Sequence, residues 1–159
     1  MKIKIIHFIS LFLLLLVTGV FWGTWFTLTR SLDEFSAGEF IHIGKVIIAN
    51  VAVPMSIIMP LCILFVILSL LYYPEKRSSG YFLNILALVL IIITLLITLL
   101  ILVPIDNQIK QWTTFTLPSN WESIRSRWDS YHAFRTFSSL ASFGCFALSI
   151  LNSKKTTVS

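Results

Sequence analysis

Residues that could carry chemistry recur along one predicted helix near the C-terminal end of the sequence. They follow one another at spacings of three and four residues: Arg125, Trp128, His132, Arg135 and Ser139. This period places side chains on a single helical face. An imidazole titrates near neutrality and can act as a base, and a guanidinium can stabilise a developing oxyanion. We therefore expect His132 and Arg135 to be catalytic residues.

A polar stretch precedes this helix. Asp106 and Asn107 follow Pro104 at the end of an apolar run, and proline discourages helix at the residue before it. We expect an irregular polar segment here, between the third and fourth helices. Polar backbone at membrane depth must be shielded by protein or lie against water. The segment therefore predicts either the wall of a pocket or an interfacial loop.

Arg135 needs an acceptor, because apolar sequence follows it directly. An unpaired charge in a membrane costs about 2.5 to 3.5 kcal/mol near the centre and less toward the surface. Asp106 is the best predicted partner, and the other candidates are Asp129, Glu34 and Glu39. Two interpretations stay open. The first is a structural ion pair between helices, and the second is a ligand pocket in which Arg135 and His132 meet a substrate.

Three further residues of this region are predicted to bind substrate, and Asp106 is grouped with them. Asn107 can orient a substrate carbonyl, and Trp112 or Trp128 can stack on a flat ring. The alternative for Trp112 is an aromatic anchor at the membrane surface, together with Trp121.

The composition predicts the elements that position these residues. The chain has 159 residues, of which 57% are hydrophobic and 12% charged, and its mean hydropathy is +0.89. These values predict an integral membrane protein, and four runs reach the roughly 20 residues that a span needs. The runs are 5–27, 46–73, 81–103 and 129–151. We expect an all-α, four-helix transmembrane bundle that forms a single domain over residues 1–159.

Two spans carry signals of their own. The second contains Pro54 and Pro60, which predict one kinked helix, because each proline removes a backbone donor. The fourth contains several small residues, Ser138, Ser142 and Gly144 among them. Small residues allow close helix contact, so this helix is expected to pack inside the bundle.

The charges predict an orientation. Four spans place both termini and the middle loop on one side of the membrane. That side carries six cations near the spans against the single acid Glu75: Lys2, Lys4, Lys76, Arg77, Lys154 and Lys155. The opposite side carries as many cations, so the counts tie: Arg30, Lys45, Lys110, Arg125, Arg127 and Arg135. The first set flanks the spans in short loops, whereas several of the second set are predicted members of a site. On that ground the positive-inside rule places both termini in the cytoplasm. The net charge of +5 reflects these anchors and favours an anionic lipid surface over nucleic acid.

Metal and thiol chemistry are not predicted. His42 and His132 come from different helices and lack a ligand motif, so we expect neither a metal nor a haem. Cys62 and Cys145 are single and lie within apolar runs, so they are expected to be packing thiols. We expect no cofactor. The expected partners are the lipid bilayer and a small apolar, aromatic or quinone-like ligand, and a homo-oligomer stays open.

Three segments resemble the anthrone oxygenase family, a family of small four-helix membrane proteins. They are "GVFWGTWFT" in the first span, "PIDNQIKQW" after the third and "RWDSYHAFR" at the start of the fourth. The resemblance maps the following residues onto the family's polar positions: Asn107, Trp112, Arg127, Trp128, His132 and Arg135. It also implies oxidation of an anthrone to an anthraquinone by molecular oxygen, without a cofactor.

A non-enzymatic interpretation stays open beside this one. The chain can be an accessory subunit, or a lipid or quinone binder, whose polar residues only lock the helices together. That interpretation predicts that a carboxylate, of Asp106 or Asp129, pairs with Arg135 and that no cavity opens between the helices. An enzyme or binder predicts a pocket lined by His132, Arg135, Asn107 and a tryptophan.

Overall fold

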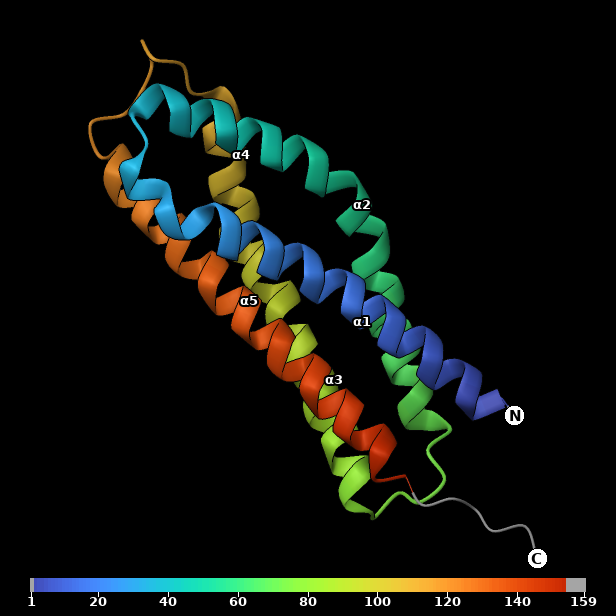
Figure 1. The fold of residues 1–159 in the computed structure, drawn as a ribbon. Coiled ribbons are helices and arrows are strands. Elements are labelled where there is room, and N and C mark those ends of the chain that lie inside the picture. Colours follow the sequence, from blue (N-terminus) through green and yellow to red (C-terminus); the bar gives the residue numbers. More distant parts are fainter. Residues whose placement is uncertain (1, 154–159) are drawn as a thin grey trace, which may run out of the picture.

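The structure is a computed structural model that describes residues 2–153, and Figure 1 shows its fold. Lys154 and Lys155, which enter the predicted orientation, lie outside the described residues. The elements are α1 (Lys2–Thr27), the 3-10 turn η1 (Thr29–Glu34), α2 (Ala37–Leu71), α3 (Ser79–Ile97), the π-helical turn η2 (Thr98–Leu102), α4 (Val103–Gln111) and α5 (Trp121–Leu151). Because α3, η2 and α4 follow one another without a break, the described chain forms four long rods. The predicted all-α four-helix fold is confirmed.

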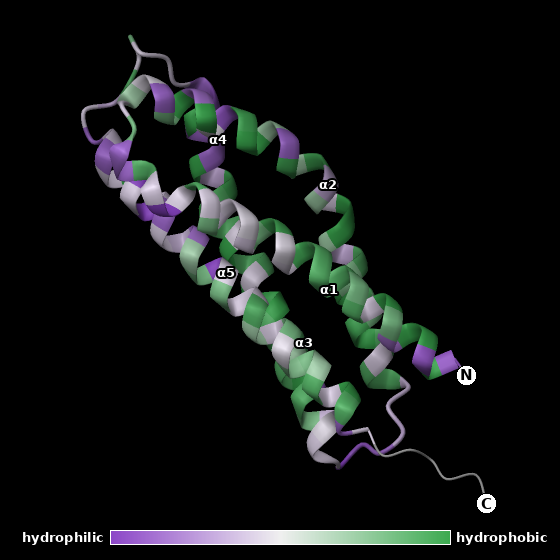
Figure 2. Ribbon diagram, viewed as in Figure 1, coloured by the Kyte–Doolittle hydropathy of each residue, from purple (hydrophilic) through white to green (hydrophobic). Residues whose placement is uncertain are grey.

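Each rod is long and apolar enough to cross a membrane. The longest, α2, has 35 residues, or about 52 Å at the usual rise of 1.5 Å per residue. Large apolar side chains point outward from the rods, such as Val53 at 68% and Leu100 at 69% exposure. Hydrophilic residues gather toward the two ends in Figure 2, most densely at the end opposite the termini. The chain is an integral membrane protein, and the four span limits given above stay a prediction.

Serine side chains fasten α5 to α3. Ser142 Oγ donates a hydrogen bond to the Ala87 carbonyl at 2.8 Å, and Ser149 Oγ donates to the Gly80 carbonyl at 2.7 Å. Both serines are fully buried. The small residues of the fourth apolar run therefore do place this helix inside the bundle, as the sequence predicts.

Two apolar clusters fill the bundle. The cluster toward the termini consists of Leu14, Val17, Phe21, Met59, Cys62, Val66, Ala87, Ile91 and Phe146. The cluster at the opposite end consists of Leu32, Phe40, Ile41, Ile48, Leu102, Ile105, Ile109, Trp112 and Trp128. We call them the inner and outer clusters. The side chains between them pack less completely, which leaves the space described below.

The segment after Pro104 is helical, so the prediction that it is irregular from that point is wrong. In η2 the Val103 amide donates to the Thr98 carbonyl, five residues earlier. Pro104 then occupies the first turn of α4 and, because it has no amide hydrogen, donates no backbone bond to the preceding turn of the rod. The wider turn lets the rod continue past the proline to Gln111. The irregular part is confined to residues 112–120.

Pro54 and Pro60 both lie inside α2. Figure 1 shows α2 change direction about half-way along its length. The predicted single kinked helix is confirmed, and its cause is the loss of two backbone donors.

Gly80 supplies a test of the α3–α5 contact. A methyl group there would collide with the Tyr73 hydroxyl and lie 3.0 Å from the Ser149 carbonyl oxygen. That hydroxyl donates to the same carbonyl at 2.8 Å. We expect Gly80→Ala to lower the free energy of unfolding by about 1 to 3 kcal/mol through overpacking and a lost hydrogen bond. Thermal unfolding in detergent measures the effect.

Gly19→Ala is the matched control, because no atom lies within 4 Å of a methyl group placed there. It should leave the unfolding midpoint unchanged or raise it, since alanine favours helix over glycine. Equal effects of the two substitutions would show that the Tyr73–Ser149 contact contributes nothing.

Candidate functional site

A cavity of about 390 Å³ lies between the inner and outer clusters. Its walls come from all four rods. The lining residues are Val20, Phe21 and Thr24 of α1; Ile47, Ile48, Val51, Ala52, Met55, Ser56, Met59 and Pro60 of α2; Leu95, Thr98, Leu99, Val103, Asp106 and Lys110 of the α3–η2–α4 rod; and Trp128, His132 and Arg135 of α5. Most of the wall is apolar, and the charged groups gather at one end.

The cavity opens sideways between α2 and the α3–η2–α4 rod. Ala52 and Ser56 on α2, and Leu99 and Val103 on the rod, line the cavity and are also exposed. The lining residues of α1 and α5 are half-buried or buried. Both backbone irregularities lie at this opening, the kink of α2 and the π turn η2. The mouth therefore faces the apolar surroundings of the bundle.

Four buried or half-buried side chains lie at the charged end of the cavity, and we call them the polar cluster: Asp106, Trp128, His132 and Arg135. The exposed Lys110 also lines the cavity, and its charge acts on Asp106. Trp128 Nε1 donates to Asp106 Oδ1 at 2.8 Å, and the Trp128 and His132 ring centroids lie 4.2 Å apart. Arg135 Nη2 lies 2.9 Å from His132 Nδ1. The predicted shared face of α5 is confirmed, since these α5 residues are all buried.

Arg135 makes no direct ion pair. Among residues 2–153 no carboxylate lies within ion-pair distance of its guanidinium, so the expected direct pair with Asp106, Asp129, Glu34 or Glu39 is not formed. Asp106 is still the acid whose charge acts on Arg135, over a longer distance. The Arg135 guanidinium lies over the Phe21 ring, 4.1 Å from the centroid, and the residue is 6% exposed.

A cation–π contact is worth about 2 kcal/mol when desolvated. A hydrogen bond to a charged group, such as that between Arg135 Nη2 and His132 Nδ1, is worth about 1.5 to 3 kcal/mol more. Arg135 Nη1 has no hydrogen-bond partner among the described residues, so it is the atom that an acceptor on a ligand would meet.

Arg125, the other guanidinium of this face, has a structural role. Its Nη1 donates to the Leu32 carbonyl at 3.1 Å and to the Phe35 carbonyl at 3.2 Å. Its Nη2 lies 3.2 Å from Asp33 Oδ1. Arg125 thus ties the segment between α1 and α2 to the start of α5 and takes no part in the cavity.

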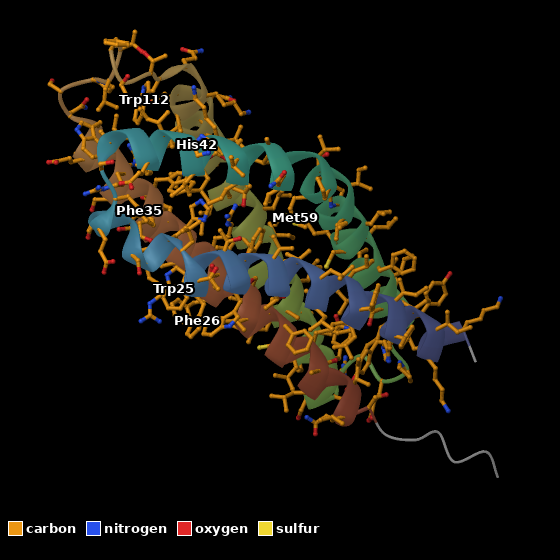
Figure 3. All side chains as sticks on the ribbon, turned by 45° about the horizontal axis from the view of Figure 1, so that its top comes forward. Trp25, Phe26, Phe35, His42, Met59 and Trp112 are labelled. Carbon is orange, nitrogen blue, oxygen red and sulfur yellow. The ribbon has the colours of Figure 1, made fainter. Side chains whose placement is uncertain are left out.

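Two residues predicted to bind substrate lie away from the cavity lining. Asn107 is exposed, and its Oδ1 accepts a hydrogen bond from Lys110 Nζ at 3.3 Å. Trp112 belongs to the outer cluster and is 7% exposed, so it is no surface anchor. Figure 3 shows it toward the loop end of the molecule, whereas Met59 lies about half-way along the bundle.

Arg127 is also outside the cavity. It is exposed, and its guanidinium lies 5.8 Å from the centroid of the Tyr131 ring.

The two histidines considered for a metal do not share a site. His42 is exposed on α2 and does not line the cavity that contains His132. In the described part of the chain, no three His, Cys, Asp or Glu side chains gather in a metal-binding group.

Sequence reasoning missed several lining residues, Phe21, Met59 and Thr98 among them. Phe21 lies inside the quoted "GVFWG" segment, but an aromatic residue in an apolar span carries no signal that separates it from core packing. Pro60 offered a signal, because a proline inside a span marks a bend where space can open.

One comparison with known proteins finds a match. The sequence model of the anthrone oxygenase family matches residues 46–145, which make up well over half of the chain. The matched region runs from α2 into α5 and includes the whole polar cluster, whereas α1 with Phe21 lies outside it. No curated protein and no solved structure matches the chain. On this match over most of its length, the chain belongs to the anthrone oxygenase family.

Proposed function

We propose that this protein is an oxygenase that oxidises a flat, apolar, enolizable ketone of the anthrone type. The cavity, whose apolar walls end in the polar cluster, carries the proposal. Its volume of about 390 Å³ falls in the range of roughly 300 to 1,000 Å³ that small-molecule pockets occupy. Membership of the family supports the same reaction class.

The chemistry balances with oxygen as the only co-reactant. The substrate methylene loses one proton to a base, and the electron pair moves to the ring carbonyl as an enolate. That electron-rich anion reacts with O₂. The methylene carbon finally loses both hydrogens, one oxygen atom becomes the new carbonyl, and the other leaves as water.

The polar cluster offers the groups that such a reaction requires. Arg135 and His132 place hydrogen-bond donors at the cavity, and Asp106 places a carboxylate there. Trp128 presents an aromatic ring beside them, which favours a flat ligand. The remaining wall is mostly aliphatic and suits a substrate that dissolves in lipid.

The non-enzymatic interpretation predicts a carboxylate paired with Arg135 and a bundle without a cavity. The cavity and the unpaired guanidinium favour a site for a small molecule. A lipid or quinone binder would share this cavity, so turnover of substrate is what separates a binder from an oxygenase.

We also propose that both termini are cytoplasmic, which places the polar cluster toward the outer side of the membrane. The cations of the first residues and of the α2–α3 loop support this orientation: Lys2, Lys4, Lys76 and Arg77. All four are exposed. The polar cluster lies in the half of the bundle opposite the termini (Figure 1).

Blocking the cavity tests the oxygenase. Ser56 lines the mouth and is exposed, so a tryptophan there would fill the entrance without disturbing packed helices. We expect Ser56→Trp in nanodiscs to lower kcat/KM for a hydroxylated anthrone by at least about tenfold, or ~1.4 kcal/mol. Anthraquinone absorbance and oxygen consumption measure the rate.

Ile57→Trp is the control for this substitution. Ile57 is the next residue on α2, is 58% exposed and does not line the cavity. Its rate should stay within about twofold of wild type. Wild-type protein that forms no anthraquinone above the protein-free rate would reject the oxygenase, and retained ligand in mass spectra would then support a binder.

The orientation has a separate test. A cysteine at Arg77, in the exposed α2–α3 loop, should be labelled by a membrane-impermeant maleimide only after intact cells are opened. A cysteine at Thr116, in the exposed α4–α5 loop, should react in intact cells. The reverse pattern would place the termini outside.

A further inference from the structure

We infer that Asp106 is the catalytic base of this site, and that the Arg135–His132 pair donates hydrogen bonds to the enolate oxygen. The inference rests on the proposed function and assigns its proton transfer to one carboxylate. It replaces the expectation from sequence that His132 is the base.

The contact between Arg135 and His132 fixes the role of the imidazole. A guanidinium only donates hydrogen bonds, so the 2.9 Å contact of Arg135 Nη2 with His132 Nδ1 requires an unprotonated Nδ1. In the neutral ring the proton is then on Nε2. His132 thus has no lone pair free for a substrate proton. Protonating the ring at Nδ1 would place two cations in contact and break the hydrogen bond.

His132 Nε2 is free to act as a donor instead. It has no hydrogen-bond partner among the described residues, and it is not one of the fully enclosed polar atoms. The same holds for Arg135 Nη1. Both side chains line the cavity. Two donors therefore remain for an oxygen atom of a ligand, which is the arrangement that stabilises an oxyanion.

Among residues 2–153, Asp106 is the only carboxylate that lines the cavity. Its Oδ1 accepts from Trp128 Nε1 at 2.8 Å, which fixes the rotamer, and no described residue donates to Oδ2. The hydroxyls of Thr24, Ser56 and Thr98 in the same wall already donate to carbonyls of their own rods. Asp106 Oδ2 is thus the one strong acceptor left for a substrate proton.

The opposite charges attract each other without direct contact. Asp106 comes from α4 and the donors come from α5. In the described structure Asp106 forms no ion pair with Arg135 within contact distance, although the two charges interact over a longer distance. Trp128 contacts both the acceptor and one of the donors. Its indole nitrogen donates to Asp106, and its ring packs on the His132 ring. An acceptor and two donors that keep free hydrogen-bonding atoms can bind the C–H and the carbonyl of a single ligand.

The proton transfer balances without another reactant. The methylene C–H bond of the anthrone breaks, and its proton forms an O–H bond with Asp106 Oδ2. The C–H electron pair becomes the ring C–C bond of the enolate, and the carbonyl π pair moves onto oxygen. That oxygen accepts hydrogen bonds from Arg135 Nη1 and His132 Nε2.

Hydrogen exchange isolates this step from oxidation. Wild-type protein in nanodiscs, kept anaerobic in deuterated buffer, should exchange the methylene hydrogens of a hydroxylated anthrone faster than the protein-free solution. Asp106→Asn keeps an oxygen acceptor for Trp128 Nε1 and removes the base. We expect it to lower the protein-dependent exchange rate by about 10²- to 10⁴-fold, the usual contribution of a general base. An unchanged unfolding midpoint checks the fold.

Two variants serve as comparisons. Asp129→Asn removes an acid of α5 that does not line the cavity, and its exchange rate should stay within about twofold of wild type. His132→Gln keeps an N–H donor but no basic nitrogen. It should lose far less exchange than Asp106→Asn. The inference is overturned if His132→Gln lowers the exchange rate as much as Asp106→Asn does. It is also overturned if Asp106→Asn keeps the wild-type exchange rate.

The readouts separate this inference from the proposed function. Exchange that depends on Asp106 without oxidation in air supports the base and rejects the oxygenase. Oxidation that persists in Asp106→Asn supports the oxygenase and rejects the base. Wild-type protein that neither exchanges nor oxidises rejects both.

Discussion

A guanidinium enclosed by apolar helices needs partners from more than one helix. Arg135 finds one in the Phe21 ring of α1 and another in His132 of its own helix. An acid at this position would neutralise the charge and close the site, because a buried ion pair satisfies both members at once. Asp106 does not serve that purpose, because Trp128 holds its Oδ1 and neither carboxylate oxygen lies within ion-pair distance of Arg135. The site therefore keeps a positive and a negative group side by side, both with hydrogen-bonding capacity left for a third molecule.

The cavity depends on places where helical hydrogen bonding is interrupted. Regular apolar helices pack to the density of organic crystals and leave few voids. Here Pro54 and Pro60 bend α2, and the π turn before Pro104 widens the opposite rod. The two interruptions face each other across the mouth. On the other side of the bundle, serine hydroxyls on carbonyls hold α3 and α5 together. This difference between the two sides of the bundle determines where the cavity lies. Its cause is the course of the backbone more than the size of the side chains.

Periodicity within one helix was a reliable guide from sequence, and contacts between helices were not. The spacing of Trp128, His132 and Arg135 predicted their common buried face, because 3.6 residues per turn is a local property. The direct contacts of Arg135 do not follow from the sequence, since the choice between an acid, an imidazole and an aromatic ring depends on how α1 and α4 approach α5. Pro104 was read as a helix end because its missing donor usually breaks the α pattern. A π turn, which shifts the hydrogen bonds by one residue, leaves no signal in sequence that we recognise.

Because the mouth of the cavity opens sideways into the membrane, the ligand concentration that determines binding is the one in the bilayer. A compound that enters between Ser56 and Leu99 approaches from hydrocarbon, where those two residues are exposed. Its occupancy then follows its mole fraction in the bilayer, and that depends on a partition coefficient more than on solubility in water. A sparingly soluble polycyclic compound is therefore at no disadvantage here. Apparent Michaelis constants quoted per volume of buffer would change with the amount of lipid in the assay.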